Sequence, residues 1–172
     1  MRPTIRELGP QEADALGGLM VRAYSGLPGF PSPSEQPGYY RMLRDIGSFA
    51  ERPGATILVA VSPNAELLGG VVYFGDMSQY GSGGAATSET DASGMRLLGV
   101  DPRFCHCGVG KALTGACIEL ARASGHAQVI LHTTKAMQVA WNLYEKLGFV
   151  RSGDLDFHQQ ELPVFGFRLK LR

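Results

Sequence analysis

The spacing of hydrophobic and polar positions predicts how the N-terminal part of this chain folds. Residues 4–8 alternate apolar and polar side chains, which is typical of a half-buried strand. Apolar residues then recur at helical spacing over residues 12–24 and predict a first helix. Residues 26–38 are rich in proline and glycine and predict a surface loop. A second helix is expected over residues 39–50.

The middle of the chain reads as strands with one long interruption. Apolar runs over residues 56–61 and 67–74, separated by a polar turn, predict a hairpin. Residues 75–94 are polar and glycine-rich without any period, so we expect an irregular loop there. A third apolar run predicts another strand over residues 95–100.

In the C-terminal part, strands and helices alternate. The pattern predicts a helix over residues 108–123, a strand over 128–132 and a helix over 136–147, followed by strand-like segments from Phe149 onward and over 164–171. Neither a repeat nor a compositional change marks a linker. We therefore expect one domain over residues 1–172 and an α/β (α+β) class with a mixed sheet and flanking helices.

Composition narrows the class of protein and of partner. Apolar residues make up 44% of the 172 residues, as in a globular domain. Sixteen Lys and Arg balance sixteen Asp and Glu, so we expect neither nucleic acid nor a membrane as partner. The three cysteines, Cys105, Cys107 and Cys117, form no disulfide framework and favour a cytoplasmic location.

The motif Cys105-His106-Cys107 contains zinc-ligand residue types but does not predict a metal site. It supplies at most three ligands in one strained turn, whereas structural zinc requires four. The distant histidines have no ligand spacing relative to this motif. We therefore expect no metal.

The segment from residue 95 to 113, MRLLGVDPRFCHCGVGKAL, suggests an anion site. Its apolar strand ends at Asp101-Pro102 and a helix starts near Gly108. A helix N-terminus carries free N–H groups and partial positive charge, and glycines let a phosphate approach the backbone. Because Gly-x-Gly also occurs in ordinary turns, this motif alone leaves both interpretations open.

A second candidate is the helix AWNLYEKLGF, residues 140–149, which ends at a glycine C-cap. The phenol of Tyr144 has an ordinary pKa of about 10, comparable with that of a thiol, so it is suited to protonate a departing thiolate. A helical tyrosine between Leu143 and Leu147 is equally compatible with a role in the core.

Together, in this order and about thirty residues apart, the two segments resemble the cofactor-binding core of the GNAT superfamily of N-acetyltransferases, over roughly residues 55–155. The resemblance implies the GNAT fold. In that fold a mostly antiparallel sheet of roughly six to seven strands has parallel fourth and fifth strands that splay apart, and about four helices flank it.

The resemblance also implies acetyl-CoA as co-substrate and Tyr144 as general acid. The backbone of Leu98, Gly99 and Val100 would bind the pantetheine arm, and the glycine turn would bind the pyrophosphate. Arg103 and Lys111 would supply charge, and Asn142 would provide a side-chain contact. The implied cofactor-binding residues are Leu98, Gly99, Val100, Arg103, Cys105, His106, Cys107, Gly108, Val109, Gly110, Lys111 and Asn142.

Three positions depart from the family pattern. Cys105 stands where Arg or Gln is usual, and Met137 stands where many relatives have Asn. Gly94 stands where related chains often carry a Glu that serves as general base. The base therefore stays open among Glu89, Asp91, His132 and bulk water. Arg96 fits either a substrate carboxylate or an outward surface position.

The leading hypothesis is direct transfer of an acetyl group from acetyl-CoA to a primary amine of an unidentified acceptor. The alternative is a non-catalytic acyl-CoA sensor, which the departures at Gly94 and Met137 favour. A nucleotide-binding Rossmann domain is excluded because the glycines lie far from the first strand and Leu113 replaces the third glycine. By analogy with similar proteins, we expect a homodimer.

Overall fold

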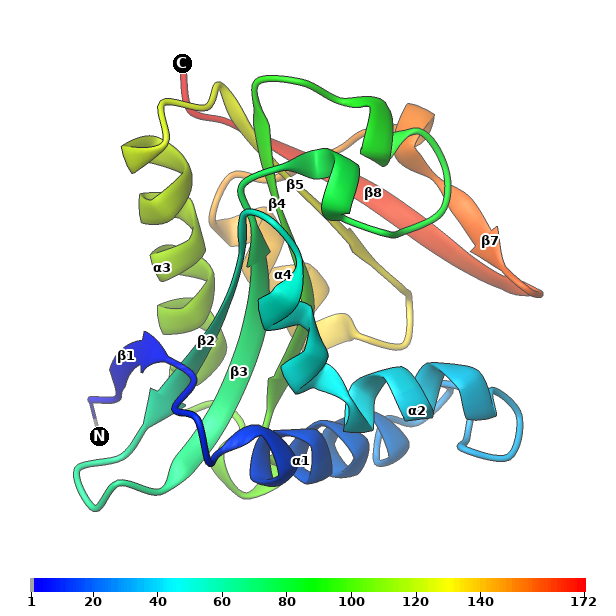
Figure 1. Cartoon of the computed structure of the whole chain (residues 1–172). Helices are drawn as coiled ribbons and strands as arrows, with labels where there is room; N and C mark the ends of the chain where they lie inside the picture. Colours follow the sequence, from blue (N-terminus) through cyan, green and yellow to red (C-terminus); the bar gives the residue numbers. More distant parts are fainter. Residues whose placement is uncertain (1) are drawn as a thin grey trace.

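A mixed sheet forms the centre of the computed structural model, which describes residues 2–172 (Figure 1). The strand order is β1-β2-β3-β4-β5-β8-β6, with β7 paired to β8. Only β4 and β5 are parallel neighbours. The strands are β1 (Thr4–Glu7), β2 (Ala55–Val61), β3 (Leu67–Phe74), β4 (Ala92–Val100), β5 (Gln128–Thr133), β6 (Val150–Arg151), β7 (Phe157–Gln159) and β8 (Leu162–Lys170).

Four α-helices cover the two faces of the sheet: α1 (Ala13–Ser25), α2 (Pro37–Arg44), α3 (Val109–Ala123) and α4 (Gln138–Lys146). Helices α1 and α2 pack on one face and α3 and α4 on the other (Figure 1). Successive side chains of a strand point to opposite faces of the sheet. In β2, Val59 packs in the core between the sheet and helices α1 and α2, and Leu58 packs in the core between the sheet and helices α3 and α4. This double burial explains the unbroken apolar runs in the sequence. No helix of residues 2–172 combines the length and apolar character that crossing a membrane requires.

The expected α/β class with a mostly antiparallel sheet is confirmed, and some boundaries are corrected. The sheet has eight strands instead of six to seven, because the strand-like stretch expected from Phe149 onward contains two short strands, β6 and β7. The second helix begins earlier, at Pro37, and is followed by a separate 3-10 helix, Ile46–Glu51. The strand β4 begins at Ala92 inside the expected loop, because small residues at its start carry little hydrophobic signal.

The parallel strands β4 and β5 separate after a short common stretch. They pair only from Ala92 opposite Gln128 to Met95 opposite Leu131. Beyond that point Leu97 has a φ of 60°, and the register of β4 against β3 slips in the same region. This β-bulge bends β4 away from β5. The expected splay is thereby confirmed, and its opening lies at the C-terminal ends of both strands.

Candidate functional site

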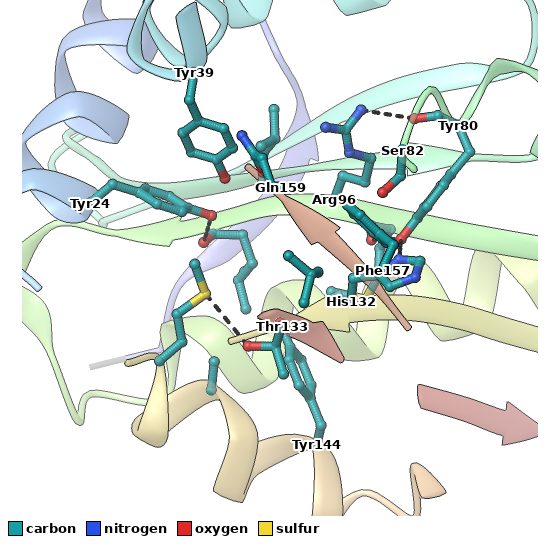
Figure 2. Close-up of a pocket in the computed structure, with 16 residues that line it drawn as sticks. Tyr24, Tyr39, Tyr80, Ser82, Arg96, His132, Thr133, Tyr144, Phe157 and Gln159 are labelled. Atoms are coloured by element: carbon teal, nitrogen blue, oxygen red, sulfur yellow. Dashed lines mark hydrogen bonds between the residues drawn. The ribbon is translucent and has the colours of Figure 1, made fainter. Parts of the chain in front are cut away.

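A pocket occupies the opening between β4 and β5 (Figure 2). Four tyrosines line it: Tyr24, Tyr39, Tyr80 and Tyr144. Tyr24 and Tyr39 project from the side of α1 and α2, and Tyr144 projects from α4 on the opposite side. Arg96 and His132 also line the pocket, whereas none of its lining residues in the described part of the chain is Asp or Glu.

The glycine turn before α3 leaves the helix N-terminus accessible. Gly108 precedes the first helical residue with a φ of 82°, a left-handed conformation that favours glycine. A Cβ placed at Gly108 would have no atom within 4 Å. The first N–H groups of a helix have no partner within the helix. The sequence predicts that these N–H groups bind a phosphate, and the open space beside Gly108 is compatible with that prediction.

Gly110 is the point where three predicted binding segments meet. A Cβ at Gly110 would lie 3.5 Å from Leu143 Cδ2 of α4, 3.8 Å from Val100 Cγ2 and 3.9 Å from Leu98 Cδ2. The end of β4, the start of α3 and the middle of α4 are therefore adjacent. The same end of β4 is also tied to α1, because the Tyr24 hydroxyl donates to the Leu98 carbonyl oxygen at 2.8 Å.

Most of the other predicted cofactor residues surround this turn and are exposed. They include Cys105, His106, Cys107 and Lys111, and Asn142 is exposed on α4. Gly99 and Val109, by contrast, are buried. His106 has a φ of 66°, which bends the turn.

The guanidinium of Arg103 is already engaged. It donates to Asp101 at 3.0 Å and to Glu66 at 3.1 Å. These two carboxylates compensate its charge. Lys111 makes no ion pair among residues 2–172, so it is the better candidate for the charge expected at the turn.

Tyr144 is buried in the core and also lines the pocket, so its position is compatible with both predictions from the sequence. It is 4% exposed and packs edge-on against Phe149, with ring centroids 5.7 Å apart. It also lines the pocket between the strands. Burial raises the pKa of its phenol, and the neighbouring Cys117 adds to this effect. The phenol is therefore protonated at neutral pH.

His132, one of the four open candidates for the base, is held by two hydrogen bonds. Its Nε2 lies 2.8 Å from the Leu155 carbonyl oxygen, and its Nδ1 lies 2.9 Å from the Tyr80 hydroxyl. A carbonyl only accepts, so Nε2 carries the hydrogen and Nδ1 of the neutral ring accepts from Tyr80. Burial is the main cause that lowers the pKa of His132, which favours the neutral form.

Tyr80 fills the space that Gly94 leaves open. A Cβ at Gly94 would lie 2.6 Å from Tyr80 Cδ1 and 2.7 Å from Met77 Sδ. The ring of Tyr80 thus stands beside the position where related chains carry Glu, and its hydroxyl is turned to His132. Sequence reasoning missed Tyr80 because it follows a 3-10 turn in an aperiodic loop.

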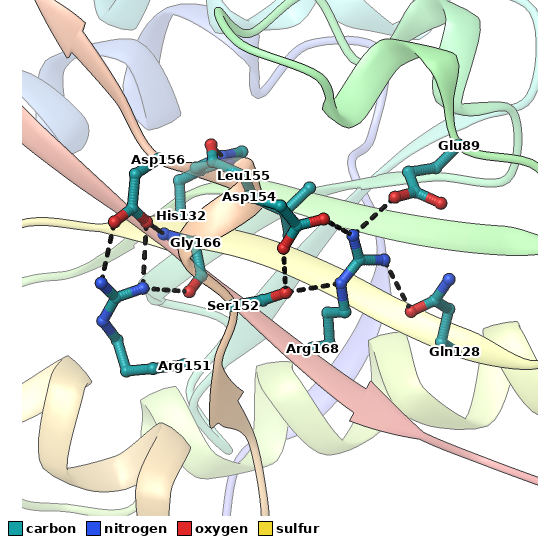
Figure 3. Close-up of polar contacts among 10 residues, drawn as sticks. All are labelled: Glu89, Gln128, His132, Arg151, Ser152, Asp154, Leu155, Asp156, Gly166 and Arg168. Atoms are coloured by element: carbon teal, nitrogen blue, oxygen red, sulfur yellow. Dashed lines mark hydrogen bonds and ion pairs between the residues drawn. The ribbon is translucent and has the colours of Figure 1, made fainter.

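Glu89 and Asp91, the two carboxylates considered as general base, each form an ion pair with an arginine. Glu89 accepts from Arg168 at 2.6 Å, and Asp91 accepts from Arg172 at 2.9 Å. Neither lines the pocket. Arg168 also binds Asp154 of the 3-10 turn Gly153–Leu155, next to the carbonyl that holds His132 (Figure 3).

Sequence comparison identifies relatives of the central region. Residues 21–149 match the Acetyltransferase (GNAT) family. N-acetylaspartate synthetase of Danio rerio is 39% identical over 62 residues, which are 36% of this chain and 22% of that protein. Mycothiol acetyltransferase of Streptosporangium roseum is 46% identical over 55 residues, which are 32% of this chain and 16% of that protein. The matches thus span less than a quarter of the length of these two relatives.

Solved structures share the fold at low sequence identity. A GNAT-family acetyltransferase from Staphylococcus aureus has a TM-score of 0.75 at 15% identity, covering 99% of this chain and all of that one. The paiA N-acetyltransferase from Thermoplasma acidophilum, in complex with coenzyme A, has a TM-score of 0.75 at 17% identity, covering 99% of each chain.

Proposed function

Because the chain belongs to the GNAT acetyltransferase family, we propose that it transfers an acetyl group from acetyl-CoA to a primary amine by direct attack. The observation that carries this proposal is the meeting of three segments at Gly110, beside a pocket lined by Tyr144. Those segments would bind the two parts of the co-substrate, and the pocket would receive the acceptor.

In the proposed complex, the free N–H groups at the start of α3 bind the pyrophosphate, with Lys111 adding charge. The backbone of Leu98, Gly99 and Val100 lies along the opening between β4 and β5 and binds the pantetheine arm. This arrangement delivers the thioester to the pocket between Tyr80 and Tyr144.

The amine nitrogen attacks the thioester carbonyl carbon, forming the new C–N bond, and must lose a proton. We assign that proton to the Tyr80–His132 pair: the Tyr80 hydroxyl accepts it while passing its own proton to His132 Nδ1. The resulting imidazolium keeps its Nε2 bond to the Leu155 carbonyl oxygen. The lowered pKa of His132 ensures that the acceptor form is present at neutral pH.

When the C–S bond breaks, CoA leaves as a thiolate, and Tyr144 donates its phenolic proton to the sulfur. Burial raises the pKa of the phenol above its usual value, which makes it a weaker acid. The same burial raises the pKa of the neighbouring Cys117 thiol to about 12. A CoA thiolate that forms beside Tyr144 is made more basic by the same physics, so the two groups stay matched.

The test combines calorimetric titration with acetyl-CoA and measurement of thiol release against a panel of primary amines. We expect tight binding and amine-dependent release in the wild type. Tyr144→Phe should retain binding and lose about 100-fold in kcat, the usual contribution of a general acid.

Tyr73→Phe is the matched control because it removes a buried hydroxyl, bonded to Ser93 at 2.7 Å, outside the pocket. It should retain kcat. Binding of acetyl-CoA without thiol release with any amine would contradict the enzymatic function and favour a non-catalytic acyl-CoA sensor. Absence of binding would remove both proposals.

A further inference from the structure

Two arginines meet beside the pocket, and neither is paired with a carboxylate among residues 2–172. Arg96 comes from β4 and lines the pocket, and Arg52 follows the 3-10 helix Ile46–Glu51. Both guanidinium groups lie over the ring of Phe49, at 4.3 Å for Arg52 and 5.8 Å for Arg96. None of the ion pairs in the described chain includes either residue.

Backbone carbonyls hold both side chains in place. Arg96 Nη1 donates to the Tyr80 carbonyl oxygen at 2.8 Å, and Arg52 Nη1 donates to the Gln79 carbonyl oxygen at 2.9 Å. The two Nη1 atoms lie 3.5 Å and 2.5 Å from the point where a Cβ of Gly81 would stand, so the two cations are neighbours. Arg96 has five N–H donors, and its second contact is only a weak one to Met42 Sδ at 3.6 Å.

The charge of this arginine pair is not compensated locally. Desolvation lowers the pKa of Arg52, and the positive charge of Arg96 lowers it further. The field of Arg96 also acts on the phenol of Tyr39, although burial prevails and raises that pKa to about 12. Like charges in a partly buried place are unfavourable unless an anion lies close to them. An anion bound close to both guanidinium groups would relieve this repulsion.

We infer that the acceptor is a small primary amine that carries a carboxylate, and that Arg96 binds this carboxylate while Arg52 adds its field. This inference rests on the proposed acetyl transfer and names its substrate class. A guanidinium fork matches the two oxygens of a carboxylate, and Figure 2 places Arg96 in the same pocket as Tyr80 and His132. The amine of such an acceptor would lie near the Tyr80 hydroxyl.

Acceptors with a second positive charge are disfavoured by the same geometry. The lining of the pocket contains no Asp or Glu among the described residues, so a second ammonium group would meet Arg96 without a compensating carboxylate. Diamines and polyamines are thus expected to be poor acceptors compared with amino acids.

The test uses glycine, β-alanine and γ-aminobutyrate, each compared with its carboxamide, as acceptors in the thiol-release assay. The three acids vary the distance between amine and carboxylate, and each amide keeps the carbon chain but carries a neutral group in place of the carboxylate. We expect the wild type to prefer at least one acid over its amide in kcat/KM. That preference should fall roughly tenfold to hundredfold in Arg96→Gln, by a smaller factor in Arg52→Gln, and should be partly restored in Arg96→Lys.

The ratio of acid to amide is compared between the wild type and each variant, so that the different intrinsic reactivities of the two amines, and any general loss of fold, cancel. Arg44→Gln, which removes an exposed arginine, should leave the preference unchanged. A wild type that acetylates amines without preferring any acid would overturn the inference and leave the acetyltransferase standing.

Calorimetry provides a second readout that does not depend on turnover. The same acids are titrated into the protein saturated with CoA, which has no acetyl group to transfer. Binding of an acid that is lost in Arg96→Gln would support the carboxylate site even if no thiol release is detected. An acid that binds equally to the wild type and Arg96→Gln would refute the site.

Discussion

Two hydrogen bonds fix the tautomer of His132, and this determines which of its nitrogens is able to accept a proton. Nε2 donates to the Leu155 carbonyl oxygen, so only Nδ1, on the side of Tyr80, is free to gain a proton. The groups that act on this ring are Tyr80, Arg96 and Asp156. Burial and Arg96 outweigh the two effects that raise the pKa of His132, which are the hydrogen bond to Leu155 and the charge of Asp156, so this pKa lies below its ordinary value of 6.5.

His132→Gln should lower kcat by about 100-fold, because the proton acceptor is lost. In the wild type, protonation of His132 should produce an acid limb in the pH profile of kcat below about pH 6.5. Tyr80→Phe keeps the ring beside Gly94 but removes the hydroxyl that passes a proton to His132, so it should also slow turnover.

The measurement for these variants is kcat from pH 5 to 9 with two acceptors of different amine pKa. An acid limb that follows the acceptor, or persists in His132→Gln, would rule out this role.

The sequence alone indicated some residues of the candidate site and gave no sign of others. Gly108, Gly110 and Tyr144 stand in local patterns, because helix starts and helix stops have short-range chemical requirements. Tyr80 has no such pattern. Its importance arises from the missing side chain of Gly94, fourteen positions further along the chain, and only the folded sheet brings the two together.

At the level of elements, the start of α3 provides a sharp comparison with its end. Gly108 precedes the helix with a φ of 82°, and Gly125 follows it with a φ of 73°. Neither position has an atom within 4 Å of an added Cβ. Both Ala substitutions should therefore destabilise the fold similarly, by about 1 kcal/mol through backbone strain.

Only Gly108→Ala should weaken acetyl-CoA binding, by about tenfold or more, because its methyl group enters the space assigned to the pyrophosphate. Thermal unfolding measures the shared loss of stability, and calorimetry measures the separate loss of affinity. Equal affinities in Gly108→Ala and Gly125→Ala would argue against a phosphate site at the start of α3.

The sequence pattern located the long periodic elements closely and gave no bounds for the two shortest strands. Helices α1 and α3 each bury one face over several turns, so their spacing is a strong signal. Strands β6 and β7 have only two and three residues, so the strand-like stretch expected from Phe149 onward could not be divided into separate strands. Their positions are determined by pairing with β8.

At the scale of the whole molecule, acid stability depends in part on the link between β1 and α1. Glu12, just before α1, accepts from Arg6 at 2.8 Å and from the Gly9 backbone N–H at 2.7 Å. The bond from Arg6 is the main cause that lowers the pKa of Glu12 from 4.5 to about 2. A carboxylate whose pKa is lower in the folded protein than in the unfolded chain stabilises the fold at any pH above its unfolded-state pKa. This stabilisation is lost as the pH falls through its folded-state pKa.

We therefore expect the contribution of Glu12 to be complete above about pH 4.5 and to vanish toward pH 2. Glu12→Gln should lower the free energy of unfolding at pH 7 by about 1 kcal/mol, since the pair is partly exposed, and by much less at pH 2. Glu119→Gln, which breaks the longer 3.5 Å pair with Arg122, is the control and should have little effect. Denaturant unfolding at several pH values provides the measurement. An effect of Glu12→Gln that is the same at pH 7 and pH 2 would contradict the pKa.

The proposed acceptor pocket illustrates what could not be read from the sequence at this scale. The family resemblance predicted the cofactor segments because each is continuous in the chain. Arg52, Tyr80, Arg96 and His132 come from separate parts of the chain, and although the sequence raised Arg96 and His132 singly, no continuous pattern joins the four. Their common location follows from the splay of β4 and β5, so the fold had to be known first.

That splay gives the sheet an unpaired edge in its interior. Edges normally lie at the periphery of a sheet, where their free backbone groups meet water or another chain. Here β4 is no longer paired with β5 after Met95, although it stays paired with β3 on its other side. If the pantetheine arm binds there, it completes the sheet in the way an added strand does. The co-substrate would then serve as a removable part of the scaffold, and each release of CoA would reopen the interior edge.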